Sequence, residues 1–168
     1  MMMNNNSDLN QISIGKPLPD WTLESIFGDA VPDKADFIGK PLLILIFSFG
    51  CPGCVGRAIP FANRNVYEKG EKLNVLGIHT NFEGVDFPVE RFQKFKEELF
   101  IRFPFYKDFK FNTTFLEYGA GGTPHWVVVN KNGIVEYSIF GSDPNNALLR
   151  LGYLIDELTE EYPSEKKQ

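Results

Sequence analysis

The uninterrupted apolar run from Leu42 to Phe47, LLILIF, limits most strongly what this chain can fold into. The run is rich in residues that favour β-strands, and because every position is apolar, both faces of such a strand must be buried. A strand of this kind lies in the middle of a sheet that is covered on both sides. The run is also far shorter than the roughly 20 apolar residues that a membrane-spanning helix needs.

The segments around this strand alternate between helical and strand patterns. The closing segment begins with Asp143 and Pro144, which are typical of a helix N-cap and of the first helical position. Alternation followed by a hairpin predicts an α/β fold with a mixed central sheet flanked by helices. In chain order, the predicted elements are a short edge strand within 15–23, the buried strand within 40–49, a helix over 52–69, a strand within 72–81, an amphipathic helix within 88–100, a hairpin over 123–141 and a helix over 143–162.

Length and charge restrict the function classes. The 168 residues predict one domain, residues 12–162, between a disordered tail (1–11) and a short C-terminal tail (163–168). The first ten residues, MMMNNNSDLN, have no basic or apolar region of the kind that signal peptides carry, which favours the reducing cytoplasm. A net charge of −5 without a basic run argues against nucleic acid or a membrane as a partner.

The only two cysteines, Cys51 and Cys54, are three positions apart in SFGCPGC, and three interpretations compete. A zinc site needs about four ligands, and the two histidines of the chain, His79 and His125, lie in separate segments, so no metal is predicted. A structural disulfide across so short a loop constrains the unfolded chain little. A redox pair is favoured because the cysteines follow a buried strand, at the strand–helix junction where α/β sheets usually carry their chemistry.

The redox interpretation accounts for each residue of this motif. Cys51 at a helix N-cap lies beside unpaired N–H groups and the positive end of the helix dipole, which favour a thiolate. Pro52 suits the first helical position, because the N–H that it lacks would go unpaired there. Gly53 is expected to leave room for an approaching partner chain. Cys54, one turn further along, faces back toward Cys51 but lies deeper.

A second unusual motif is GGTPHW, in which Thr123 and Pro124 enter a predicted strand. Proline cannot donate to a sheet ladder, so its place at this point needs an explanation. An ordinary trans proline at a strand start is the more frequent case. The upstream cysteine pair favours a cis Thr123–Pro124 bond, with the backbone of Thr123 turned toward a substrate.

The combination of FSFGCPGC, GTPHWVVVNKNG and a terminal helix resembles the thioredoxin-like superfamily. The openings IGKPLPDWTLESIFG and IGKPLLILIFSFGCPGC resemble its TlpA-like and AhpC/TSA-like thiol–disulfide oxidoreductases over about residues 12–160. The resemblance implies a three-layer α/β/α sandwich with an N-terminal extension and no cofactor. It implies that Cys51 attacks and Cys54 resolves a mixed disulfide, in exchange with client proteins or small disulfides and with an upstream dithiol donor. The substrate-contacting positions that it implies are Pro52, Gly53, Thr123, Pro124 and His125.

Several residues depart from the pattern of the family. Leu45 stands where thioredoxin has a buried Asp, and Arg57 where many TlpA-like proteins have a Glu. Pro60 comes one residue later than the helix proline of thioredoxin, so the helix register is expected to differ. His125 either lies near Cys51 and favours its thiolate or has no part in the chemistry.

Two rival functions stay open at this point. The first is a peroxiredoxin, whose Pro-x-x-x-Thr/Ser-x-x-Cys motif is met by Ser48 but has Ile44 in place of the proline. The second is a thioredoxin-like domain used only for binding, against which the intact cysteine pair argues.

Overall fold

The computed structural model describes residues 12–81 and 86–160, and the predicted tails lie outside these residues. Six strands form one mixed sheet in the order β1-β4-β3-β2-β5-β6. The central strands β2, β3 and β4 are parallel, whereas β1, β5 and β6 pair antiparallel with their neighbours. The strands are β1 (Leu23–Glu24), β2 (Leu42–Phe47), β3 (Asn74–His79), β4 (Phe105–Asp108), β5 (His125–Val129) and β6 (Val135–Phe140).

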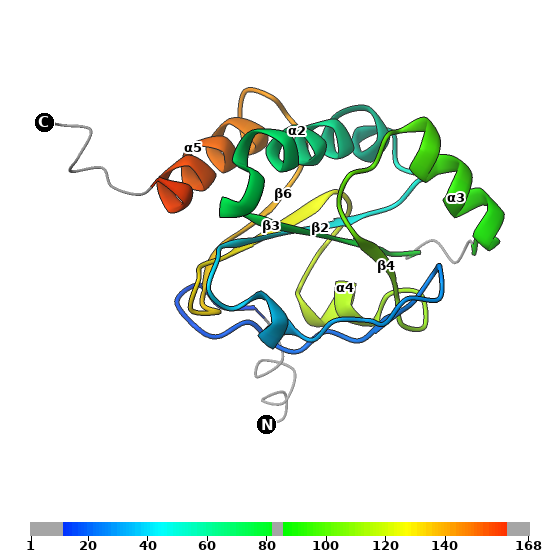
Figure 1. The fold of residues 1–168 in the computed structure, drawn as a ribbon, viewed down its shortest axis with the longest axis horizontal. Helices are drawn as coiled ribbons and strands as arrows, with labels where there is room; N and C mark the ends of the chain where they lie inside the picture. The colour runs from blue at the N-terminus through cyan, green and yellow to red at the C-terminus, as the bar shows by residue number, and fades with distance from the viewer. Residues whose placement is uncertain (1–11, 82–85, 161–168) are drawn as a thin grey trace, which may run out of the picture.

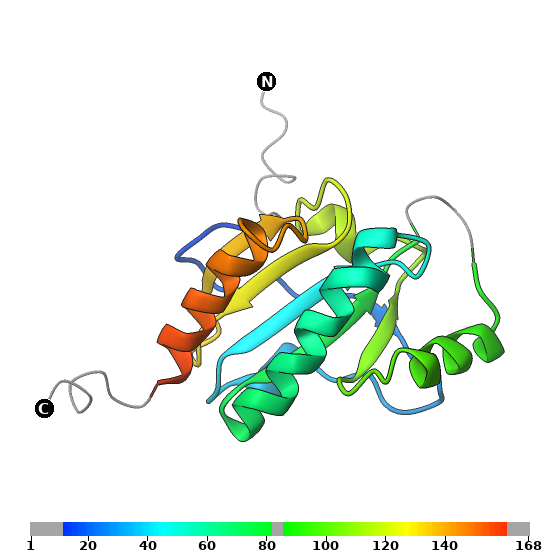
Figure 2. The same cartoon turned by 90° about the horizontal axis from the view of Figure 1, so that it is seen from above.

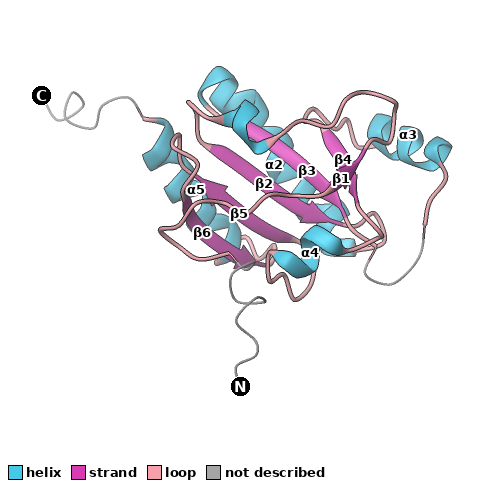
Figure 3. Cartoon of the chain, turned by 90° about the horizontal axis from the view of Figure 1, so that it is seen from below, coloured by secondary structure: helices cyan, strands magenta, loops and turns pink. Residues whose placement is uncertain are grey.

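Helices cover both faces of this sheet, which gives the predicted three-layer sandwich (Figure 1). Seen from above, α2 and α5 lie across one face with α3 toward the β4 edge (Figure 2). The opposite face carries α4 and the N-terminal segment (Figure 3). The helical elements are η1 (Lys34–Phe37), η2 (Cys54–Ala58), α2 (Ile59–Lys69), η3 (Gly70–Lys72), α3 (Val89–Glu98), α4 (Thr113–Glu117) and α5 (Ala147–Thr159). Of the helices in the described part of the chain, none is long and apolar enough to cross a membrane.

The apolar run 42–47 behaves as its composition predicts, since every residue of β2 is buried. Alternate side chains enter two cores, one under α2 and α5 and one over α4. Leu45 and Phe47 belong to the first core, whereas Ile44 and Ile46 belong to the second. Burial of apolar surface stabilises the folded state by ~25 cal/mol per Å², and β2 buries such surface on both of its faces. The strand therefore stabilises the packing of both helical layers.

The start of the closing helix was predicted wrongly. Asp143 and Pro144 do not begin α5, which starts at Ala147 after Asn146. The Asp143 carboxylate instead accepts the N–H of Asn145 at 3.0 Å, and its carbonyl accepts the N–H of Leu148 at 3.0 Å. An Asp closes a local turn with the same short side chain with which it caps a helix, so the two structures share one sequence signal.

Four further elements were not predicted: the strand β4, the short helix α4 and the 3-10 helices η1 and η3. The four residues of β4 include Lys107 and Asp108, which do not suggest a buried strand. Asp108 is nevertheless buried, and its carboxylate accepts the N–H groups of Thr114 at 2.7 Å and Phe115 at 2.8 Å. These bonds fasten α4 to the end of β4.

Candidate active site

The loop that follows β2 is held in place by three backbone N–H groups. The N–H of Cys51 donates to the Ser48 carbonyl at 3.1 Å, and that of Gly50 donates to Ser48 Oγ at 3.1 Å. The N–H of Phe49 donates to Nε2 of His79, which lies at the end of β3, at 3.0 Å. The loop is therefore fastened both to itself and to the neighbouring strand before it reaches Cys51.

Cys51 lies at the N-terminus of the active-site helix. It is a partly exposed free thiol, and helical structure begins at the next residue, Pro52. Its Sγ accepts the N–H of Cys54 at 3.3 Å, and its carbonyl accepts the N–H of Cys54 and of Val55 at 3.0 and 3.1 Å. The Cys54 N–H is thus shared between the carbonyl and the sulfur of Cys51 at the start of the helix.

Cys54 lies one turn deeper and is fully buried. It belongs to the same apolar core as Leu45, the residue that stands where thioredoxin has an Asp. Burial raises the pKa of the Cys54 thiol, and its hydrogen bond with Cys51 raises that pKa further. The two thiols therefore differ: Cys51 is reachable from solvent, whereas Cys54 is protonated and shielded.

The Thr123–Pro124 segment lies beside Cys51, although the two motifs are 72 positions apart. The Thr123–Pro124 peptide bond is cis, which confirms the sequence prediction. The Cys51 thiol donates to the Thr123 carbonyl at 3.4 Å, and Pro124 is buried. The structure therefore brings the two predicted motifs into one site.

Gly53 has a role that the sequence did not suggest. A Cβ on Gly53 would lie 2.9 Å from Ser142 Oγ and 3.8 Å from Pro124 Cδ. The absence of a side chain makes room for Ser142 of the same chain, whereas the sequence predicts room only for an approaching partner chain. Ser142 belongs to the loop after β6, so no local sequence signal connected it to the cysteines.

The side chain of His125 does not bring a positive charge to the site. Alternation along β5 places His125 on the face opposite Trp126, and Trp126 shares the core of Cys54. Nε2 of His125 lies 2.8 Å from Ser138 Oγ, and burial lowers the pKa of His125 to about 4. The histidine is therefore neutral near pH 7, and the alternative in which its charge favours a Cys51 thiolate is not supported.

The first turns of the active-site helix contain one extra residue. Residues Cys54–Ala58 form a π-helix, in which the N–H of Ile59 donates to the carbonyl of Cys54, five positions earlier. Pro60 follows directly and has no N–H to continue an α-helical ladder there. This confirms the register difference that the late position of Pro60 predicted. Arg57 is exposed within this turn.

The site can perform thiol chemistry with its own two cysteines. Within residues 12–81 and 86–160, no three His, Cys, Asp or Glu side chains are grouped so that they could hold a metal ion. The reachable sulfur, the shielded sulfur one turn away and the carbonyl beside them are the elements that thiol–disulfide exchange uses.

Comparison with known proteins agrees with this geometry. Residues 14–138 match the AhpC/TSA family. A thiol-disulfide isomerase from Corynebacterium glutamicum is 25% identical with a TM-score of 0.76, over 88% of this chain and 98% of that chain. A thioredoxin-like superfamily protein is 29% identical with a TM-score of 0.74, also over 88% and 98%.

A third structure shares the fold at lower identity. It is described as a putative thiol:disulfide interchange protein DsbE from Chlorobium tepidum, and it is 21% identical with a TM-score of 0.74, over 89% of this chain and 99% of that chain. No curated protein matches the sequence. Because the match covers residues 14–138 of the 168, the chain belongs to the AhpC/TSA family and has its thioredoxin-like fold.

Proposed function

We propose that this protein is a thiol–disulfide oxidoreductase that reduces disulfides of client proteins through a mixed disulfide at Cys51. The observation that carries the proposal is the inequality of the two thiols. Cys51 is partly exposed at the start of a helix, whereas Cys54 is fully buried one turn further on. A reductant of this class needs one sulfur that a client can reach and a second that is protected until the first has reacted.

The proposed reaction consists of two displacements. The Cys51 thiolate attacks one sulfur of a client disulfide; a Cys51–client bond forms, the client S–S bond breaks and one client thiolate leaves. Cys54 then loses its proton and attacks Cys51 Sγ, which releases the second client thiolate and leaves a Cys51–Cys54 disulfide. The departing client thiolates take up the protons, and the two electrons have passed from the protein to the client. An upstream dithiol donor restores the reduced pair.

The helix geometry supports the first displacement. The N–H of Cys54 already points at Cys51 Sγ, at 3.3 Å, and this donor stabilises a negative charge on that sulfur more than a neutral thiol. The Thr123 carbonyl accepts the Cys51 proton in the resting dithiol at 3.4 Å. Loss of that proton frees the carbonyl for the N–H of a client backbone.

A peroxidase function is less well supported. The hydroxyl that such an enzyme would direct toward the attacking sulfur belongs to Ser48, which is 2% exposed. Its Oγ accepts the N–H of Gly50 at 3.1 Å, and Ile44 at the position of the motif proline is buried in the sheet. The Ser48 oxygen therefore accepts a hydrogen bond within its own loop, and the motif proline is absent.

Reduction of insulin with dithiothreitol, followed by turbidity, tests the proposal with the wild type, Cys51→Ser and Cys54→Ser. We expect Cys51→Ser to fall to the rate of dithiothreitol alone. Cys54→Ser should accumulate a mixed disulfide that mass spectrometry detects on Cys51. Equal rates for the wild type and Cys51→Ser would refute the proposal, as would peroxide consumption that exceeds insulin reduction in the same preparation.

The direction of electron flow depends on the reduction potential. Thioredoxin-like pairs span about 150 mV, which corresponds to roughly 7 kcal/mol for two electrons. Equilibration of Cys51–Cys54 against glutathione mixtures measures where this protein lies. A potential near that of thioredoxin supports the reductant that we propose, whereas one near that of a strong oxidant reverses the direction.

A further inference from the structure

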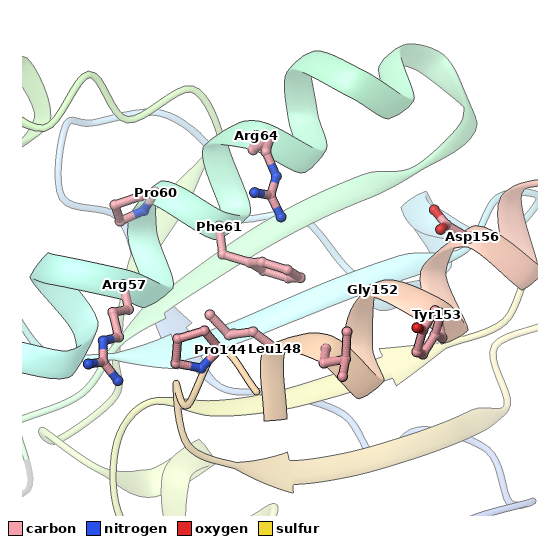
Figure 4. Close-up of a pocket in the computed structure, with 10 residues that line it drawn as sticks. Arg57, Pro60, Phe61, Arg64, Pro144, Leu148, Gly152, Tyr153 and Asp156 are labelled. Carbon is pink, nitrogen blue, oxygen red and sulfur yellow. The ribbon is translucent and has the colours of Figure 1, made fainter. Parts of the chain in front are cut away.

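A groove of about 680 Å³ lies between α2 and α5, beyond the active-site turn (Figure 4). We call it the α2–α5 groove. Phe61 and Leu148 line it from the two helices. Arg57 lines it at the end beside Pro144, and Arg64 lines it above Phe61 (Figure 4). The groove thus combines an apolar lining with two guanidinium groups.

Arg57 is the guanidinium group that is available to a ligand, because the Arg64 guanidinium lies over the Phe61 ring, 5.5 Å from its centroid. Arg57 is exposed and has no acidic partner among residues 12–81 and 86–160. Arg64 lies 4.0 Å from Glu68, and both side chains are more than half exposed, a pair that contributes little. Asp156, the carboxylate that lines the groove, is already bonded to Lys69. On a chain of net charge −5, this is a local basic site.

Gly152 keeps the groove open at a cost to helix stability. It lies in the middle of α5 and lines the groove, and a Cβ placed on it would meet no atom within 4 Å. Glycine inside a helix is less stable than alanine by about 1 kcal/mol. Neither a close neighbour nor a left-handed backbone requires glycine here. What a side chain at this position would occupy is the groove itself.

The loop after β6 links the surroundings of Cys51 to the groove. Ser142, which packs over Gly53, is two residues from Pro144, and Pro144 lines the near end of the groove. Arg57 follows Cys51 by six positions, which is about 9 Å along a helix. An extended peptide spans about 3.3 Å per residue, so about three client residues cover the same length along the helix axis.

We propose that the α2–α5 groove binds an acidic segment of the client polypeptide while the client cysteine is joined to Cys51. A client carboxylate pairs with Arg57, and a neighbouring apolar side chain packs against Leu148 and the exposed ring of Tyr153. An Arg–carboxylate contact is a charge-assisted hydrogen bond, and the exposed position of Arg57 makes it sensitive to salt. The inference rests on the proposed function and adds a substrate class, disulfides that have Asp or Glu about three residues from the cysteine.

The test uses peptides whose single cysteine forms a mixed disulfide with thionitrobenzoate, so that its release is followed by absorbance. Glu, Ala or Lys stands three residues before or after the cysteine. For one of the two placements, we expect kcat/KM for the Glu peptide to exceed that for the Ala peptide about threefold, with the Lys peptide slowest. The preference should shrink as salt rises from about 0.05 to 0.5 M, because screening weakens an exposed contact.

Matched variants locate the effect. Arg57→Glu should reverse the order of the peptides, whereas Arg102→Glu, an equal charge change at an exposed residue outside the groove, should not. Gly152→Trp should slow the Glu peptide by occupying the groove, and Gly152→Ala, which is small and favours helix, should not. Circular dichroism confirms that each variant folds.

Hydroxyethyl disulfide, which is small and uncharged, separates the two proposals. If Cys51→Ser reduces it as fast as the wild type, the proposed function itself fails. If the wild type reduces it through Cys51 but treats the Glu, Ala and Lys peptides alike, or if Arg57→Glu leaves their order unchanged, the groove proposal is overturned and the exchange activity stands.

Discussion

Acidification from pH 7 to pH 5 should destabilise this protein through its two buried histidines. His79 and His125 are 1% and 7% exposed. Burial, with a smaller contribution from Lys107, lowers the pKa of His79 to about 3, and burial lowers that of His125 to about 4. Both pKa values lie below the ordinary 6.5. Between the folded-state pKa and 6.5, each histidine is therefore protonated in the unfolded chain but neutral in the folded chain.

The sign and size of the effect follow from linkage. Below pH 6.5 each histidine lowers the free energy of unfolding by ~1.4 kcal/mol per pH unit, or about 2 kcal/mol at pH 5. Asp108 acts in the opposite direction, because burial raises its pKa to about 6, against the backbone N–H bonds that it accepts. The folded chain therefore gains a proton on Asp108 as the pH falls, worth about 1 kcal/mol at pH 5. A net loss of about 2 to 3 kcal/mol is expected.

Urea unfolding at pH 7 and pH 5, followed by tryptophan fluorescence, measures this loss in the wild type and in His79→Gln. The glutamine does not titrate, and its side-chain oxygen is placed to accept the Phe49 N–H as His79 Nε2 does at 3.0 Å. We expect the variant to lose about 2 kcal/mol less than the wild type between the two pH values. A wild type equally stable at both pH values, or a variant with an undiminished loss, would refute the reasoning.

Three further experiments test the site and the sheet. In reduced protein, limiting iodoacetamide should label Cys51 before Cys54, because the second thiol is fully buried; peptide mapping that finds Cys54 labelled first would reverse the assigned order. Gly53→Ala should slow insulin reduction severalfold, since its Cβ would lie 2.9 Å from Ser142 Oγ, and Ser142→Gly should restore the rate; no rescue would place the defect elsewhere. Gly77→Ala should cost about 1–3 kcal/mol in urea unfolding, since its Cβ would lie 2.8 Å from each of two aromatic side chains; a change within 0.5 kcal/mol, about the size of a surface substitution, would argue against tight packing.

The parts of the fold that the sequence predicts are those with a strong local signal. Leu42–Phe47 is apolar throughout and forms the central strand β2. Cys51, Cys54 and Pro124 were recognised because their spacing and their neighbours are unusual within a few residues. In each case the physical constraint, burial on both faces or a proline at a strand start, acts on the segment itself.

The parts that the sequence did not predict depend on contacts between distant segments. Strand β4 is stabilised by pairing with β3 and β1, and its buried Asp108 is acceptable only because the N–H groups of α4 meet it. The sequence indicates His79 only as a candidate metal ligand, whereas in the structure it accepts the N–H of Phe49, 30 positions earlier. Ser142, in the loop after β6, lies against Gly53. No window of sequence contains both members of these pairs.

The π turn between Cys54 and Ala58 also affects how the length of this chain can vary. It holds one residue more than an α-helix would use over the same turn, and the surplus is absorbed before α2 begins at Ile59. Loss of a single codon here would convert the turn to an ordinary α-helix and leave both flanks in place. The same loss within β2 would move its following side chains to the opposite face of the sheet. Length differences of one residue between relatives are therefore expected in this helix and not in the strand before it.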